Sequence, residues 1–251
     1  MCPGWYPESA RLIVRGVTDP QHEHQTLAVL FDIDGTLISS GGAGSVAWRQ
    51  AFEDLYGIPA DIGKFTDAGM TDPEVGRLTF EAVLGRKPSS RELSRVLAKR
   101  QRHLPAAIAA SKGYRVLPGV RERLDQLHDD GYLLGLTTGG TEATAHIKLA
   151  RGDLNHFFNF GGYGSDSSDR TELTKRAIER AGTVLGHPVD PARVVVVGDT
   201  PLDIEAAHGA GARGIGVATG HYSVDELRKA GADAVLETLE EELPLETPLS
   251  S

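Results

Sequence analysis

The sequence predicts a doubly wound, Rossmann-like α/β fold, in which a parallel sheet forms the core and an α-helical cap domain is inserted. Three observations carry this prediction. Short apolar runs typical of buried parallel strands alternate with segments of helical period. Acidic and glycine-containing motifs follow several of these runs, where open α/β sheets bind their ligands. One long internal stretch breaks the alternation and holds only helical patterns.

The first strand is expected at Leu27–Phe31, a continuous apolar run suited to burial on both faces of a sheet. Further strands are expected at Tyr132–Leu136, Arg193–Val197, Gly214–Val217 and Ala232–Leu236. The helical segments between them are Val120–Asp129, Glu142–Arg151, Glu172–Leu185, Leu202–Ala210 and Val224–Ala230. This alternation assigns residues 27–38 and 115–242 to an α/β core domain.

Residues 39–114 form the predicted cap domain. Helical patterns cover Val46–Tyr56, Pro73–Leu84 and Ser90–Ala110, and no convincing strand lies among them. The flanking residues 39–44 and 112–118 have the composition of linkers, which suggests a hinged insert. The alternative is that the same helices pack as ordinary elements of one domain.

Composition and charge narrow the classes of partner. The 251 residues, 40% hydrophobic and 24% charged, suit one core domain with room for an insert. The formal net charge of −9 argues against nucleic acid or an anionic membrane, since both need a basic surface. An anionic substrate must therefore be bound by local positive charge. The oligomeric state stays open.

Cysteine usage and hydropathy bear on the compartment. Cys2 is the only cysteine, so no intramolecular disulfide can form and a reducing compartment fits. No apolar run long enough to cross a membrane is present, and the first residues lack the apolar segment of a signal peptide. We therefore expect a cytoplasmic protein. Residues 1–26 are expected to be an N-terminal extension and residues 243–251 a C-terminal tail, both without assigned chemistry.

Two aspartates follow the first predicted strand. Asp32 and Asp34 flank one residue, and the turn that starts at Gly35 can aim their carboxylates differently. Neighbouring carboxylates repel each other and attract a cation. Mg²⁺ prefers about six oxygen ligands, usually one or two carboxylates with water and phosphate oxygens. These residues therefore indicate a magnesium site.

Two more aspartates follow a later strand and extend this site. Asp199 comes directly after the run of valines and would supply a second carboxylate. Asp203 lies one helical turn farther on, where it could bind the ion, orient a ligand, or only cap the helix. For Asp32, the alternative role is that of a turn or capping residue at the end of a strand.

A phosphate group also needs hydrogen-bond donors and a cation. Thr138 and Gly139 end the strand that starts at Tyr132, and they offer a hydroxyl and an unhindered backbone N–H. Arg170 is the first candidate for the cation, and Lys175 is the second. Thr138 could instead cap the helix that follows, and Arg170 could instead form a surface ion pair.

Four motifs occur in an order that resembles the haloacid dehalogenase superfamily of hydrolases. They are Phe-Asp-Ile-Asp-Gly-Thr-Leu at 31–37, Leu-Thr-Thr-Gly-Gly at 136–140, a basic residue, and Val-Gly-Asp-Thr-Pro-Leu-Asp at 197–203. The helical insert between the first two motifs resembles the type 1 cap of phosphoglycolate phosphatases and β-phosphoglucomutases. The segment Gly-Met-Thr-Asp-Pro at 69–73 is also similar to that group's cap.

The resemblance implies a Mg²⁺-dependent phosphatase that hydrolyses a small-molecule phosphate monoester. Asp32 would attack phosphorus and form an aspartyl-phosphate, which water then hydrolyses. Asp34 would protonate the leaving oxygen, deprotonate the water, and give its backbone carbonyl to the metal. Thr138 and Arg170 would stabilise the transferring group. The presence of Asp34 favours phosphoryl transfer, because the dehalogenases of the superfamily lack an acid there.

Two other functions are compatible with parts of this pattern. A phosphomutase would share every core residue and differ in how the closed cap re-presents the intermediate to a hydroxyl. A non-catalytic binding protein is the third class, and the intact set of motif residues argues against it. Arg170 departs from the lysine of many relatives, although residues 169–173 resemble a branch that uses arginine.

Overall fold

The computed structural model describes residues 26–245, and it confirms the predicted fold class. Most of the predicted extension and most of the predicted tail lie outside the described residues. Six parallel strands form one sheet in the order β5-β4-β1-β6-β7-β8. In chain order they are β1 (Ala28–Phe31), β4 (Leu133–Thr138), β5 (Gly161–Tyr163), β6 (Val194–Gly198), β7 (Arg213–Val217) and β8 (Ala234–Leu236).

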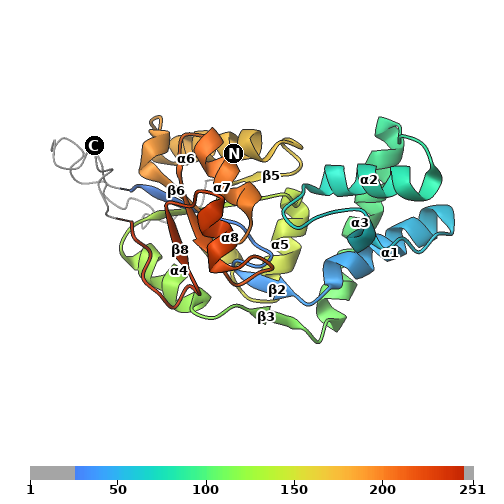
Figure 1. Ribbon diagram of the computed structural model, residues 1–251, viewed down its shortest axis with the longest axis horizontal. Helices are drawn as coiled ribbons and strands as arrows, with labels where there is room; N and C mark the ends of the chain where they lie inside the picture. The colour runs from blue at the N-terminus through green and yellow to red at the C-terminus, as the bar shows by residue number, and fades with distance from the viewer. Residues whose placement is uncertain (1–25, 246–251) are drawn as a thin grey trace, which may run out of the picture.

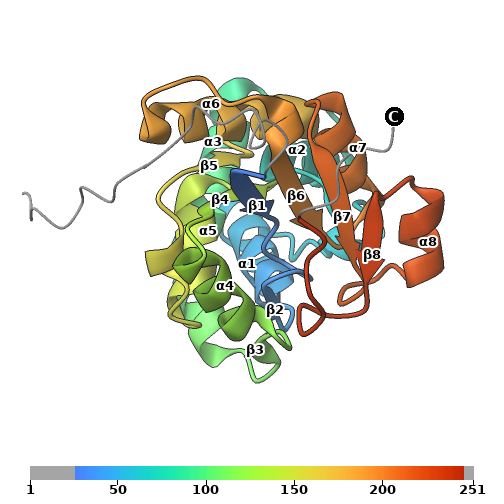
Figure 2. The same cartoon turned by 90° about the vertical axis from the view of Figure 1, so that its left-hand side faces the viewer.

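Helices cover both faces of this sheet (Figure 2). The α4 (Val120–Asp129) and α5 (Glu142–Ala150) helices lie on one face, and α6 (Arg170–Leu185) and α7 (Pro201–Gly209) lie on the other. The short helix α8 (Val224–Lys229) packs against β7 and β8. Within residues 26–245, 3₁₀ turns occur at η3 (Ile62–Lys64), η4 (Asn155–Phe157) and η5 (Pro191–Arg193).

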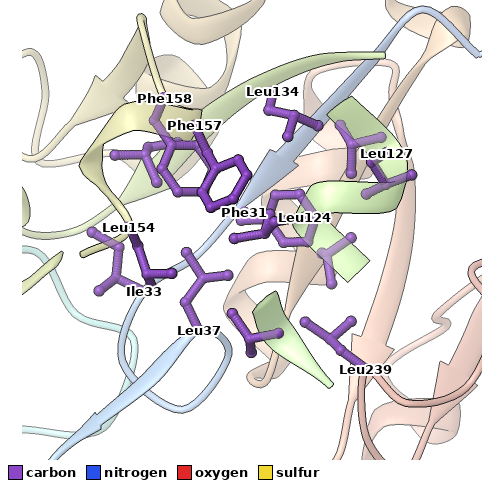
Figure 3. Close-up of a cluster of buried hydrophobic side chains, with 14 of the residues drawn as sticks. Phe31, Ile33, Leu37, Leu124, Leu127, Leu134, Leu154, Phe157, Phe158 and Leu239 are labelled. Carbon is purple, nitrogen blue, oxygen red and sulfur yellow. The ribbon is translucent and has the colours of Figure 1, made fainter. Parts of the chain in front are cut away.

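The β1 strand is buried on both faces, as its apolar run predicts. Val29 and Phe31 belong to the core cluster beneath α4 and α5, whereas Ala28 and Leu30 belong to the cluster beneath α6 and α7. Figure 3 shows Phe31 among side chains of α4 and of the segment after α5. Loss of a phenylalanine from such a core typically costs about 3–5 kcal/mol. The packing thus fixes the strand that ends at the first motif.

The direction in which successive strands are added to the sheet changes beside β1. From β1 it proceeds to β4 and β5 on one side, and it then returns to β6 on the other side of β1. Ligands of open α/β sheets bind outside the carboxyl ends of the strands at such a switch point. The first and the last motif therefore follow neighbouring strands at this point.

The helical insert forms its own packed unit at one end of the molecule (Figure 1). It contains α1 (Ala43–Tyr56), α2 (Asp72–Leu84) and α3 (Ser90–Ala110). Aromatic side chains from α1 and α2 dominate its core, including Trp48, Phe52 and Phe80, each at most 2% exposed. This unit is the cap of the predicted fold class.

The expectation of no strand near residues 39–114 needs correction. Strands β2 (Ile38–Ser40) and β3 (Tyr114–Val116) pair antiparallel where the chain enters and leaves the cap. Because each strand has three residues, neither shows an alternating pattern in the sequence. The predicted domain boundaries at 38–39 and 114–115 stay a prediction, since these two strands run across them. None of the helices in residues 26–245 combines the length and apolar character needed to span a bilayer.

Candidate active site

A cavity of about 610 Å³ lies between the carboxyl edge of the sheet and the cap. The core contributes motif residues to its wall, namely Asp32, Asp34, Thr138, Gly139, Arg170 and Asp199. The cap contributes Trp48 from α1 and Arg100 from α3, together with the loop at residues 66–70. A larger groove of about 790 Å³ lies along the outer side of α6 and contains none of these residues.

Three of the predicted metal ligands gather at one point. One carboxylate oxygen from each of Asp32, Asp199 and Asp203 lies within 4.8 Å of the others. All three residues are buried, with exposures of 7% or less. The backbone at Gly220 packs directly against this cluster, because a Cβ on Gly220 would lie 1.7 Å from Asp199 Oδ2. The Asp34 carboxylate, by contrast, is not part of this cluster.

Burial and mutual repulsion disfavour the ionised forms of two of these carboxylates. Burial and repulsion from Asp203 raise the pKa of Asp32 to about 7, although Arg170 acts in the opposite direction. Burial and the neighbouring Asp32 raise the pKa of Asp199 to about 9. Carboxylates in this state are stabilised as anions by a bound divalent cation. An all-oxygen, acidic set of this kind fits the ligand preference of Mg²⁺.

Arg170 is the cation of this cluster. Asp169 caps α6 by accepting from the backbone N–H of Thr171, and this places Arg170 in the first turn, beside the cavity. The Arg170 Nη2 atom lies 3.3 Å from Asp32 Oδ1 and also donates to Asp203 Oδ1. Its Nη1 atom donates to the carbonyl oxygen of Gly69 in the cap at 2.8 Å. Arg170 is therefore not a surface residue.

The surface ion pair that is the alternative role of Arg170 would use the nearby acids Asp166 or Asp169, and both are engaged elsewhere. Asp166 pairs with Arg180, at 2.6 Å between Oδ2 and Nη1, and the carboxylate of Asp169 caps α6. Asp203 forms a capping box with Thr200 through Oδ2, which is the capping role that the sequence allowed. Its Oδ1 atom accepts from Arg170, and its roles toward a metal ion stay predictions.

The predicted phosphate loop lies directly under the cap. Thr138 is 3% exposed, and its hydroxyl accepts from the backbone N–H of Gly140 at 3.3 Å. The cap of the following helix is Thr141 instead, so Thr138 is not used for capping. Gly139 is needed for close approach, because a Cβ there would lie 2.6 Å from the Met70 carbonyl oxygen.

The structure places Lys175 outside the site that the sequence predicted for it. Its ammonium pairs with Glu172 on the same helix at 2.9 Å, and its side chain is 46% exposed. The residue lines the outer groove instead of the cavity. The reason is helical geometry. Lys175 lies five residues, or about 1.4 turns, after Arg170, so its side chain points from a different face of α6.

Lys148 is a cavity residue that the sequence analysis missed. Its side chain is 7% exposed, and its Nζ atom donates to Asp34 Oδ2. The available signal was the position of this lysine on a helix face that it shares with Ala145 and Leu149, both buried. A lysine among apolar residues at that spacing indicates a buried ion pair.

Another buried ion pair lies within the cap, and one of its members also binds the core. Arg100 of α3 contacts Asp72 at the start of α2 at 2.5 Å, and both residues belong to the cap. The Asp72 carboxylate also accepts from the backbone N–H of Thr141 at 3.1 Å and from the hydroxyl of Thr144 at 3.2 Å. Asp72 thus contacts the first turn of the core helix α5, beside the phosphate loop.

Comparison with known proteins gives consistent results. A family model described as a haloacid dehalogenase-like hydrolase matches residues 26–211. The chain is 28% identical to the probable phosphatase IndB of Dickeya dadantii, covering 85% of this chain and 90% of that protein. It is 27% identical to the phosphoglycolate phosphatase of Vibrio parahaemolyticus, covering 85% and 92%.

Solved structures of other proteins share the overall fold of this chain. A hydrolase from Pseudomonas syringae superposes with a TM-score of 0.65 at 26% identity, covering 85% of this chain and 94% of that chain. A putative β-phosphoglucomutase from Bacteroides vulgatus superposes with a TM-score of 0.64 at 21% identity, covering 86% and 85%. The second likeness concerns the fold.

Proposed function

The chain belongs to the haloacid dehalogenase-like hydrolase family, and we propose that it is a Mg²⁺-dependent phosphatase that hydrolyses a small-molecule phosphate monoester. The observation that carries this proposal is the contact of Arg170 with both Asp32 and Asp203 in a buried acidic cluster. A cation beside a nucleophilic carboxylate is the arrangement that phosphoryl transfer requires, because negative charge develops on the transferring group.

In the first step, an Asp32 carboxylate oxygen forms a bond to phosphorus while the bond to the leaving oxygen breaks. Asp34 gives its proton to that oxygen, so the product leaves as an alcohol. In the second step, Asp34 takes a proton from water, whose oxygen attacks phosphorus and releases inorganic phosphate and free Asp32. Thr138, Gly139 and Arg170 stabilise the phosphoryl oxygens throughout.

The metal belongs to this proposal as well. Asp32, Asp199 and Asp203 would hold Mg²⁺ together with the backbone carbonyl of Asp34, where it would neutralise charge on the carboxylates and the phosphoryl group. The raised pKa values of Asp32 and Asp199 support this assignment. Asp34 itself keeps its carboxylate outside the cluster, as a proton donor requires.

The substrate class follows from the relatives and from the size of the cavity. The Vibrio relative is named a phosphoglycolate phosphatase, and the Dickeya relative a probable phosphatase. A cavity of about 610 Å³ suits a small molecule. We therefore propose a small phosphate monoester, with phosphoglycolate and sugar phosphates as the first candidates.

A panel of monoesters tests the proposal. The purified protein with Mg²⁺ is incubated with phosphoglycolate, sugar phosphates and p-nitrophenyl phosphate, and both phosphate release and isomer formation are measured. We expect phosphate release that EDTA suppresses and added Mg²⁺ restores. Isomer formation without phosphate release would assign a phosphomutase instead. Binding without turnover of any monoester would assign a non-catalytic protein.

A further inference from the structure

Lys148 is a buried cation of the cavity that the proposed mechanism does not use. Its side chain is 7% exposed and its ammonium contacts Asp34, whose own side chain is 40% exposed. Both residues line the cavity. Lysine is almost never buried to this extent without a partner, because desolvation of the ammonium is costly. The pair with Asp34 therefore accounts for the position of Lys148.

The helix that carries Lys148 is held firmly at both ends. At its start, Asp72 of the cap accepts hydrogen bonds from Thr141 and Thr144. At its end, the backbone carbonyl of Lys148 accepts from the hydroxyl of Tyr114 at 2.8 Å. Lys148 also lies in the last turn of α5, where the helix dipole favours a cation. The backbone of α5 is thus held in place where the Lys148 side chain extends into the cavity.

Two cations contact three of the four acidic residues of the site. Arg170 comes from α6 and contacts Asp32 and Asp203 of the cluster. Lys148 comes from α5, on the opposite face of the sheet, and contacts Asp34. The Asp34 carboxylate is two residues from Asp32 but outside the set of oxygens within 4.8 Å of one another. Attraction to Lys148 acts to keep it there.

We propose that Lys148 is a positioning residue that holds the Asp34 carboxylate away from the acidic cluster and at the cavity wall, where the leaving oxygen of a substrate is protonated. This inference rests on the proposed function. Lys148 forms and breaks no bond in the reaction. The proton moves between Asp34 and the leaving oxygen, and Lys148 acts through the direction in which Asp34 points.

The test compares leaving groups that differ in their need for a proton. p-Nitrophenolate leaves readily without protonation, whereas an alkoxide does not. General acid catalysis contributes about 10²- to 10⁴-fold, so a displaced Asp34 in Lys148→Met should lower kcat for an alkyl phosphate at least about 10-fold more than for p-nitrophenyl phosphate. Lys148→Arg keeps the charge and should recover much of this difference.

A matched lysine–aspartate pair in the cap serves as the control. Lys99 of α3 contacts Asp54 of α1 at 2.8 Å, and neither residue lines the cavity. Lys99→Met should therefore leave the ratio of the two kcat values unchanged. A crystal structure of Lys148→Met gives a second measurement that needs no turnover, because the Asp34 carboxylate should leave its wild-type position.

Several results would overturn the inference. Equal losses on both substrates together with a lower melting temperature would assign Lys148 a purely structural role. A raised KM with unchanged kcat would make it a substrate-binding residue. An unmoved Asp34 in the crystal structure of Lys148→Met would exclude positioning. A wild-type protein inactive on every monoester would refute the proposed function, while the position of Asp34 would still decide the role of Lys148.

Discussion

Arg170 and Asp32, which are 138 residues apart in the sequence, meet with 3.3 Å between Nη2 and Oδ1. Asp32 follows the central strand β1, and Arg170 is the first residue of α6. Both side chains are about nine-tenths buried. A guanidinium so placed opposes the rise in the pKa of Asp32 that burial causes, and it thereby favours the ionised, nucleophilic form.

The role of Asp32 can be tested by removing its nucleophilic oxygen. Asp32→Asn should abolish turnover, and no phosphoenzyme should be trapped by acid quench with labelled substrate. The asparagine has nearly the same shape, so the folded state should be retained, which circular dichroism can check. A variant with wild-type activity would contradict the mechanism. A wild-type phosphoenzyme that is stable in acid and sensitive to hydroxylamine would support it.

The two candidate cations of the third motif make opposite predictions. Arg170→Ala should lower kcat by about 10²- to 10³-fold, the usual loss when a buried donor to a developing anion is removed. Lys175→Ala should change kcat less than about twofold, because an exposed ion pair with Glu172 contributes little. Steady-state kinetics on a good substrate decides between them. Normal activity of Arg170→Ala with loss in Lys175→Ala would reverse the assignment.

Much of the core could be predicted from the sequence because each signal was local. A strand buried on both faces needs a continuous apolar run, and the four valines from Val194 to Val197 form β6 as expected. A carboxylate that follows such a strand must lie at the carboxyl edge of the sheet, so Asp32 and Asp199 could be placed together. The elements that were missed are short. The β5 strand has three residues, two of them glycine.

The rest depends on contacts that no local pattern records. Lys148 and Asp34 are separated by 114 residues, and Arg100 and Asp72 by 28. The segments around Asp34, Asp72 and Lys148 each carry a local signal, but none of these signals identifies the oppositely charged partner. Which charges meet is decided by how α5 and the cap pack over the edge of the sheet. Lys175 was misplaced for a related reason, since its distance along the chain from Arg170 does not give its direction around the helix.

The raised pKa values of Asp32 and Asp199 predict how the stability of the metal-free protein depends on pH. Both carboxyls bind protons more tightly when folded, at about 7 and about 9, than in the unfolded chain, near 3.8. Their contribution to the free energy of unfolding is therefore fully present below the pKa of the unfolded chain, and it is lost as pH rises through 7 and 9. The melting temperature without metal should fall across this range.

Magnesium should reverse this trend, because it binds the ionised carboxylates of the folded protein. Added Mg²⁺ should therefore raise the melting temperature more at pH 9 than at pH 6, as measured by differential scanning fluorimetry. Asp199→Asn is the control, since it removes one of the two titrating groups and should flatten the pH dependence without metal. A metal-free protein that becomes more stable from pH 6 to pH 9 would contradict the prediction.

The Asp72–Arg100 pair predicts how strongly the cap depends on one buried contact. Asp72→Ala leaves Arg100, which is 2% exposed, without its carboxylate partner. Removing one partner of a buried pair typically costs about 3–5 kcal/mol, because the remaining charge is uncompensated. The double variant Asp72→Leu with Arg100→Met should recover much of that loss, since replacing both charges with apolar groups is often neutral. Urea denaturation of the wild type, the single variant and the double variant measures their free energies of unfolding.

A more exposed ion-pair network on the same helix provides the comparison. Arg77 contacts Glu74 at 2.5 Å and Glu81 at 2.8 Å, with side chains 28–36% exposed, so Arg77→Ala should cost less than Asp72→Ala, because solvent can reach the charges that remain. The Asp72 variants should also raise KM, because the hydrogen bonds from Thr141 and Thr144 that join the cap to α5 are lost in both. Recovery of stability in the double variant without recovery of KM would separate the two roles of Asp72. An unchanged KM in both would show that this contact does not hold the cap over the substrate.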